Sequence, residues 1–100
     1  MRPIASCTSI EEVRANIDRI DHELVSLLAE RSGYVMQVVR FKTTEEEVHA
    51  NERAEQVVSR AIALAHEMGA NPIVTERVYR AMIAAFIEAE LVEHAARKKN

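Results

Sequence analysis

Arg31 stands at a position where the sequence pattern calls for a buried apolar side chain. Ile10, Ile17 and Leu24 precede it at seven-residue steps. Val38 follows at the next step, so Arg31 falls on the stripe that a helix turns toward its core. A guanidinium keeps its proton, and burying it without an opposing charge is heavily penalised. Arg31 therefore indicates either a carboxylate of the protein or an anionic ligand beside it, and structural Arg–carboxylate pairs are common.

Lys42 adds a second cation to the same predicted helix. Its distance from Arg31 is eleven residues, which in a helix is three turns plus about 20°, so both would project from one face about 16 Å apart along the axis. Long side chains at that separation can grip the two ends of a small dianion. The alternative is a solvated lysine that the dipole stabilises at a helix end.

Arg14 also borders the apolar stripe, one turn before Ile17. It would lie about 25 Å from Arg31 along a straight helix. If both serve one ligand, Arg14 must come from a second protomer, which an antiparallel pairing of long helices allows. The alternative is an exposed Arg14 paired with Asp18 four residues later.

Two acidic residues are further candidates. Glu90 stands on an apolar stripe near the C-terminus, seven residues after Ile83, where a carboxyl group is either paired or protonated. The alternative is an exposed residue near a fraying helix end. Glu52 opens a predicted helix, a place where the dipole ordinarily favours an acid whatever its function.

The sequence lacks the patterns of several other kinds of site. Ser, Cys and His show no nucleophile–base arrangement, and there is no Gly-rich phosphate loop. Asp18 and His22 are four residues apart, but no third ligand has suitable spacing. We therefore expect no metal and no cofactor. The candidate residues instead indicate a cationic, preorganised pocket that stabilises a charge distribution.

The elements that must position these residues are helices. The 100 residues include two Gly, two Pro and four aromatics, with 48% hydrophobic and 29% charged residues, which favours a single all-α domain over residues 1–100 with few, long helices. Overlapping capping boxes in Thr8–Glu12 predict a first helix from about Ser9. It continues through Gly33 to about Lys42, because the apolar spacing persists.

Two more helices are predicted after a break. Thr43–Ala50 contains three consecutive glutamates, as in a solvated loop. Asn51 caps a second helix, whose core stripe runs from Ala54 to Met68 and which Gly69 closes in a left-handed conformation. Asn71-Pro72 opens a third helix. Its buried face comprises Val78, Met82, Ile83, Phe86, Ile87 and Leu91, and it frays near Arg97–Lys99.

The first predicted helix is too long for the rest of the chain to cover. It would measure about 50 Å, whereas a compact chain of this length has a radius of gyration of about 13 Å. Its stripe therefore predicts a second chain, most simply in an intertwined homodimer. A monomeric up-down bundle is the alternative.

Composition limits the partners and the compartment. A net charge of −3 argues against nucleic acid or an anionic membrane as partner. Cys7 is the only cysteine, so no intrachain disulfide forms, and an inert thiol in a reducing compartment fits. The first residues turn polar before an apolar segment develops, and no run is long enough to span a membrane. We expect a cytoplasmic protein.

Over nearly its whole length the chain resembles the all-helical chorismate mutases, and within them the short isochorismate pyruvate-lyase branch. The likeness rests on Val13-Arg14, Ile17–Asp21, Leu28–Arg31, Phe41-Lys42, Asn51–Ala54 and the acid at position 90. The resemblance implies a dimer with two equivalent sites. In each site Arg31, and Arg14 from the partner, would bind the two carboxylates of the substrate. Lys42 and Glu90 would meet its ether oxygen, and Glu52 would hold a ring hydroxyl.

Some positions depart from the family pattern. Asn51 stands where many bacterial mutases have another Arg, the loop between Lys42 and Glu52 is shorter, and Phe86 replaces a small hydroxyl residue. These three features favour the lyase branch, whereas Glu90 replaces its usual Gln and resembles the fungal mutases. We expect a chorismate mutase that converts chorismate to prephenate. The alternatives are an isochorismate pyruvate-lyase giving salicylate and pyruvate, an enzyme for an aminated analogue, and a non-catalytic helical dimerisation module.

Overall fold

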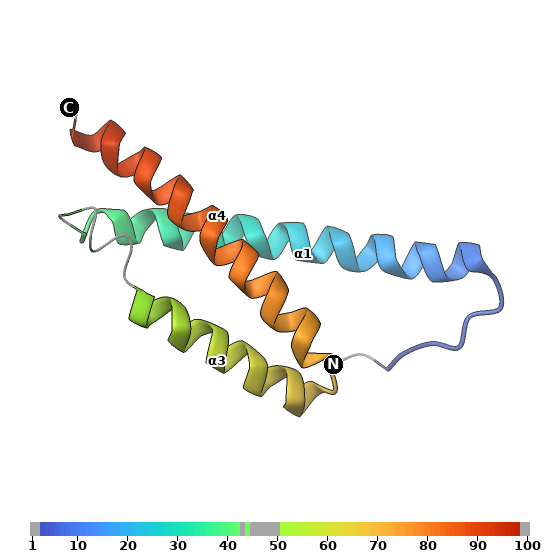
Figure 1. Ribbon diagram of the computed structural model, residues 1–100. Helices are drawn as coiled ribbons and strands as arrows, with labels where there is room; N and C mark the ends of the chain where they lie inside the picture. The colour runs from blue at the N-terminus through green and yellow to red at the C-terminus, as the bar shows by residue number, and fades with distance from the viewer. Residues whose placement is uncertain (1–2, 43, 45–50, 99–100) are drawn as a thin grey trace. The chain divides into compact units, whose positions relative to one another are not determined.

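The computed structural model describes residues 3–42, 44 and 51–98, and within these ranges it contains three helices and no strand. The helices are α1 (Ile10–Val39), α3 (Asn51–Met68) and α4 (Pro72–Lys98) (Figure 1). The all-α prediction is therefore confirmed. The loop expected over Thr43–Ala50 lies outside the described residues except for Thr44, as does Lys99 at the predicted fraying end.

The chain forms two compact parts, Met1–Tyr34 and Val35–Asn100. The first part holds most of α1 and the segment that precedes it. The second part holds the last residues of α1 together with α3 and α4. In the described residues no helix has the length and apolar character needed to cross a bilayer.

The start of α1 is fixed by side-chain hydrogen bonds. The Ser9 hydroxyl accepts a bond from the Glu12 N–H at 3.1 Å. The Glu12 carboxylate accepts bonds from the Thr8 N–H at 2.9 Å and the Thr8 hydroxyl at 3.0 Å. These two bonds, the backbone one first, lower the pKa of Glu12. The capping prediction is confirmed for Ser9 and Glu12, which satisfy donors that a helix start leaves unpaired.

The end of α1 differs from the prediction. The helix passes Gly33 unbroken but stops at Val39, not at Lys42. The amide groups of residues 40, 41 and 42 bond to carbonyls three residues earlier, at 3.2, 2.9 and 3.2 Å. Such bonds tighten the last turn and change its phase. The argument that helical spacing places Lys42 on the face of Arg31 is therefore wrong.

The apolar stripe of α1 is largely exposed in the single chain. Ile10, Ile17 and Leu24 are 55%, 50% and 51% exposed. Val39 is the buried residue of this helix, and Val38, which the seven-residue pattern selected, is exposed. Half-exposed aliphatic side chains along one helix leave apolar surface for a further element to cover.

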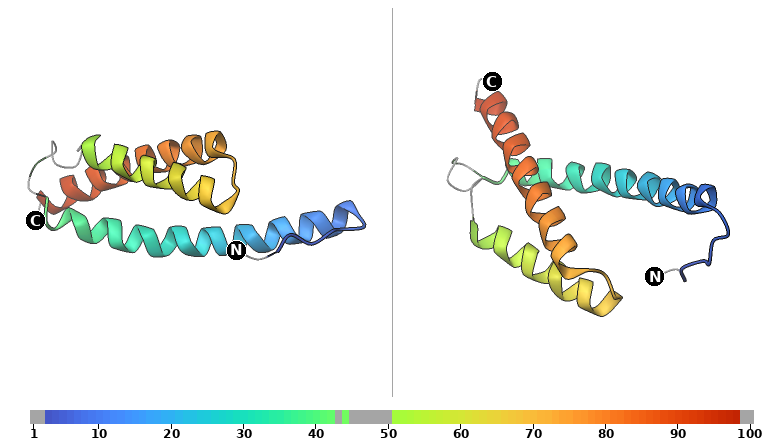
Figure 2. Two further views of the ribbon diagram at one scale, coloured as in Figure 1. Left: turned by 90° about the horizontal axis from the view of Figure 1, so that it is seen from below. Right: turned by 45° about the vertical axis from the view of Figure 1, so that its right-hand side comes forward.

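Helices α3 and α4 form an antiparallel hairpin and lie side by side in all views (Figures 1 and 2). Val58, Ala61 and Ala65 of α3 are buried. The small alanines let the two helices approach closely. Met68 and Val78, which the stripes placed in the core, are exposed in the single chain, so that part of the prediction is wrong for one protomer.

The turn between α3 and α4 is built as predicted. Gly69 has a positive φ of 73°, and the Ala70 N–H bonds to the Ala65 carbonyl at 2.8 Å, which closes α3. The Asn71 side-chain oxygen accepts bonds from the N–H groups of Ile73 and Val74 at 2.9 and 3.2 Å. Asn71 thus caps α4, and Pro72 occupies its first position, where a missing N–H costs nothing.

Candidate active site

Lys42 and Glu90 meet in the second part of the chain. Lys42 follows the tight turn at the end of α1, and Glu90 lies on α4, 48 residues further along the chain. Lys42 Nζ donates a hydrogen bond to Glu90 Oε2 at 3.1 Å. The two side chains are only 23% and 10% exposed. Glu90 can therefore lie on a core-facing stripe because Lys42 pairs with its carboxylate. The alternative, an exposed Glu90 near a fraying helix end, is wrong.

This pair supplies two groups that can act on one oxygen atom. A Lys ammonium donates hydrogen bonds and carries a full charge, and a carboxyl group donates only when it is protonated. Limited exposure to water strengthens the electrostatic effect of both groups. Aimed at an oxygen that gains negative charge, such groups stabilise that charge without forming a covalent bond.

Arg14 and Arg31 both lie on the portion of α1 that belongs to the first compact part. Arg14 is exposed. Within the described residues it makes no ion pair, so the pairing with Asp18 considered above does not form. Arg19 makes an ion pair with Glu23 on this helix, at 3.5 Å. Arg31 is half-buried, in keeping with its place on the stripe.

Glu52 occupies the first turn of α3 and is exposed. Its position suits the positive end of the helix dipole. Among residues 3–42, 44 and 51–98 it makes no hydrogen bond with Lys42 or Glu90. The structure of the second part therefore brings Lys42 and Glu90 of the predicted set into contact, and it shows no bond from Glu52 to either of them.

The sequence interpretation missed His94. This residue follows Glu90 by one turn on α4, and the two are the buried polar residues of that helix, with 6% and 7% of their surface exposed. A signal was present, because Ile83, Ile87, position 90 and position 94 continue one stripe at steps of four and three residues.

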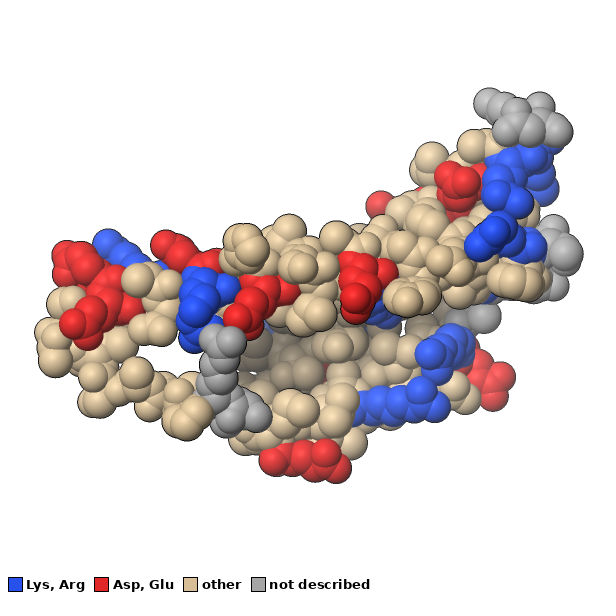
Figure 3. Space-filling view, turned by 180° about the vertical axis from the view of Figure 1, so that it is seen from behind, with Lys and Arg blue, Asp and Glu red and all other residues tan. Residues whose placement is uncertain are grey.

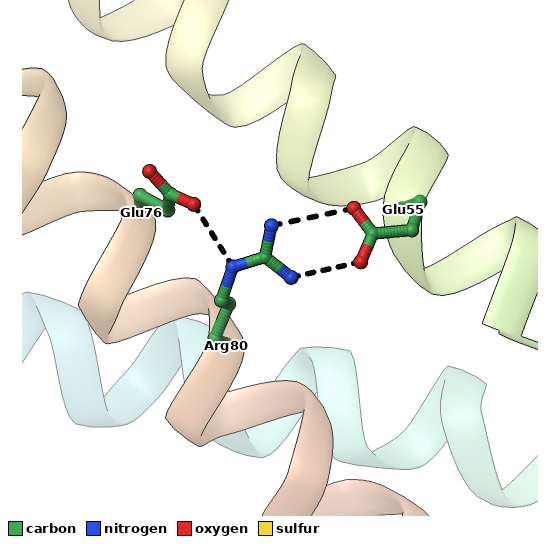
Figure 4. Close-up of polar contacts among 3 residues, drawn as sticks. All are labelled: Glu55, Glu76 and Arg80. Atoms are coloured by element: carbon green, nitrogen blue, oxygen red, sulfur yellow. Dashed lines mark hydrogen bonds and ion pairs between the residues drawn. The ribbon is translucent and has the colours of Figure 1, made fainter.

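The second residue missed is Arg80, which links α3 to α4 (Figure 4). Its Nη1 and Nη2 donate to the two carboxylate oxygens of Glu55 at 2.9 and 3.3 Å, and its Nε donates to Glu76 at 2.9 Å. The Arg80 hydrogen bond lowers the pKa of Glu55, and bonds to Glu55 and Glu76 raise that of Arg80. The cluster is exposed, so its effect on stability is small, but its two-pronged geometry fixes the register of the hairpin that carries Glu90.

Comparisons with known proteins identify the family of the chain. A curated relative, the isochorismate pyruvate lyase of Pseudomonas aeruginosa, is 30% identical over 91 residues, which cover 91% of this chain and 90% of the relative. The family model for chorismate mutase type II matches residues 13–91, a range that includes all five predicted site residues. With this match over most of its length, the chain belongs to the chorismate mutase type II family.

Proposed function

We propose that the protein is a chorismate mutase, which rearranges chorismate to prephenate in an electrostatically preorganised pocket. The observation that carries the proposal is the ion pair between Lys42 and Glu90. Breaking the ether bond of chorismate places negative charge on the ether oxygen. A half-buried ammonium at this position stabilises that charge, and the reaction needs no nucleophile, metal or cofactor.

The remaining proposed residues bind and orient the substrate. Arg31 forms a two-pronged contact with one carboxylate. Arg14, from the partner protomer, binds the other carboxylate, and Glu52 holds a ring hydroxyl. Lys42 donates to the ether oxygen, and Glu90 donates a second hydrogen bond there in its protonated form.

The apolar surface of α1 supports the proposed homodimer. Besides its exposed stripe, a groove of about 640 Å³ lies between the N-terminal segment and this helix, and Figure 3 shows the opening between them. Ile4, Val13, Ile17 and Ile20 are among the residues that line the groove. A second copy that covers this surface would bury it, and a symmetric dimer would place each Arg14 near the partner protomer.

An isochorismate pyruvate-lyase is the second candidate, and the lyase from Pseudomonas aeruginosa that matches 91% of this chain favours it. This reaction also breaks an enolpyruvyl ether bond, and it releases salicylate and pyruvate. Lys42 and Glu90 would stabilise the same ether oxygen. In the mutase reaction the methylene carbon of the enolpyruvyl group forms a C–C bond to the ring as the C–O bond breaks. In the lyase reaction that carbon takes up a ring hydrogen instead, so that pyruvate leaves and the ring becomes aromatic.

Supplying both substrates to the purified protein tests the proposal. We expect loss of chorismate absorbance with formation of prephenate, whereas salicylate fluorescence from isochorismate would establish the lyase instead. Lys42→Met should abolish most of either activity. Lys98→Met, which removes an exposed lysine from the last turn of α4, is the matched control and should not change it. A protein that consumes neither substrate would refute both activities and favour a non-catalytic helical module.

A further inference from the structure

His94 is a buried titratable residue for which the proposed chemistry has no role. It lies on α4 four residues after Glu90, and only 6% of its surface is exposed. Residues four apart on a helix are neighbours, with Cβ atoms about 5–6 Å apart. Helical side chains also lean toward the N-terminal end of their helix. Glu90 and His94 therefore project from the same face of α4, one turn apart, and both are buried there.

Glu90 has one unused carboxylate oxygen in the described part of the chain. Lys42 bonds to Oε2, and no described residue bonds to Oε1. When Lys42 turns to an anionic ligand, Glu90 loses its partner while remaining buried. With its ion pair gone, the carboxyl group of Glu90 is held by the ether oxygen of the substrate alone and can rotate away from the position in which it acts.

We propose that His94 is a positioning residue that acts through Glu90, by donating a ring N–H to Oε1 when Lys42 engages the substrate. Neutral and protonated imidazole both carry such a donor. The bond keeps the carboxyl group of Glu90 directed at the reacting oxygen. This inference rests on the proposed function, because it assigns His94 a part in the same site.

The test compares His94→Gln with His94→Leu in the full-length protein. Gln retains an N–H donor, and Leu fills the buried position without one. We expect His94→Leu to lower kcat about tenfold with little change in KM, the loss of one hydrogen bond that matters in the transition state. His94→Gln should restore most of kcat. Circular dichroism checks that both variants fold.

A double-mutant cycle separates positioning from mere packing. In a Glu90→Ala background the further change His94→Leu should have no effect on kcat, since His94 acts only through Glu90. Equal losses for His94→Gln and His94→Leu, or a tenfold loss that persists in Glu90→Ala, would overturn the inference while leaving the function intact. A wild-type protein that consumes neither chorismate nor isochorismate would overturn the proposed function, and this inference with it.

Discussion

Replacing Lys42 by Met should destabilise the protein by leaving Glu90 buried without its counter-ion. Removing one member of a fully buried ion pair costs about 3–5 kcal/mol. The Lys42 side chain is 23% exposed, so water will solvate part of the remaining charge, and we expect a loss of about 2 kcal/mol. A value near zero would mean that the ion pair has no energetic role in the folded protein.

The assay is urea denaturation followed by circular dichroism at one fixed protein concentration, because association would couple stability to concentration. Two controls sharpen it. Lys98→Met removes an exposed lysine and should change the free energy of unfolding by less than about 0.5 kcal/mol. The double change Lys42→Met with Glu90→Leu should recover most of the loss, since apolar residues can replace a buried pair.

The double variant has no carboxylate at position 90. If it is as destabilised as Lys42→Met alone, the unpaired carboxylate is not the cause of the loss, and the reasoning is refuted.

The other predictions concern the substrate contacts and the exposed ion pairs. Arg31→Lys keeps the charge but loses two-pronged binding, so kcat/KM should fall at least about a hundredfold; near-normal steady-state kinetics would remove Arg31 from the site. Inactive Arg14→Ala and Arg31→Ala subunits, refolded together, should regain activity in heterodimers with one intact site, and heterodimers without activity would refute a shared site. Glu90→Gln supplies a permanent N–H donor of similar size, so it should keep activity; an inactive Gln variant that folds normally would contradict Glu90 as a hydrogen-bond donor to the ether oxygen. Since Arg80 lowers the folded-state pKa of Glu55, the small stability advantage of wild type over Glu55→Gln should be present at neutral pH and disappear as pH falls through that pKa, and thermal melts showing the reverse trend would contradict the pairing.

Local rules predicted the helices because their signals lie within a few residues of the elements they define. The Ser9–Glu12 box, the positive φ of Gly69 and the Asn71 cap all appear where the sequence places them. The end of α1 was harder to predict. The segment directly after Val39, Arg40–Thr44, contains no glycine or proline. A three-residue bonding pattern ends the helix there without a sequence signal.

The sequence indicated a site residue where a charged side chain interrupted an apolar stripe. Glu90 interrupts an apolar stripe, which called for a partner or a proton, and Lys42 is that partner. His94 extends the same stripe, but histidine is too common at the edge of a core to signal a role by itself. The cross-helix bond between Arg80 and Glu55 depends on the packing of α3 against α4, which spacing within one helix does not reveal.

The three-residue connection between α3 and α4 bears on the order in which the chain folds. Closing so short a loop costs little chain entropy, and both helix ends beside it are capped by their own residues. Contacts between sequence neighbours form early, so the hairpin is expected to assemble before the exposed stripe of α1 finds its cover. During synthesis, however, α1 leaves the ribosome first. The nascent chain must therefore keep an uncovered apolar helix in solution until the rest of the protein has been made.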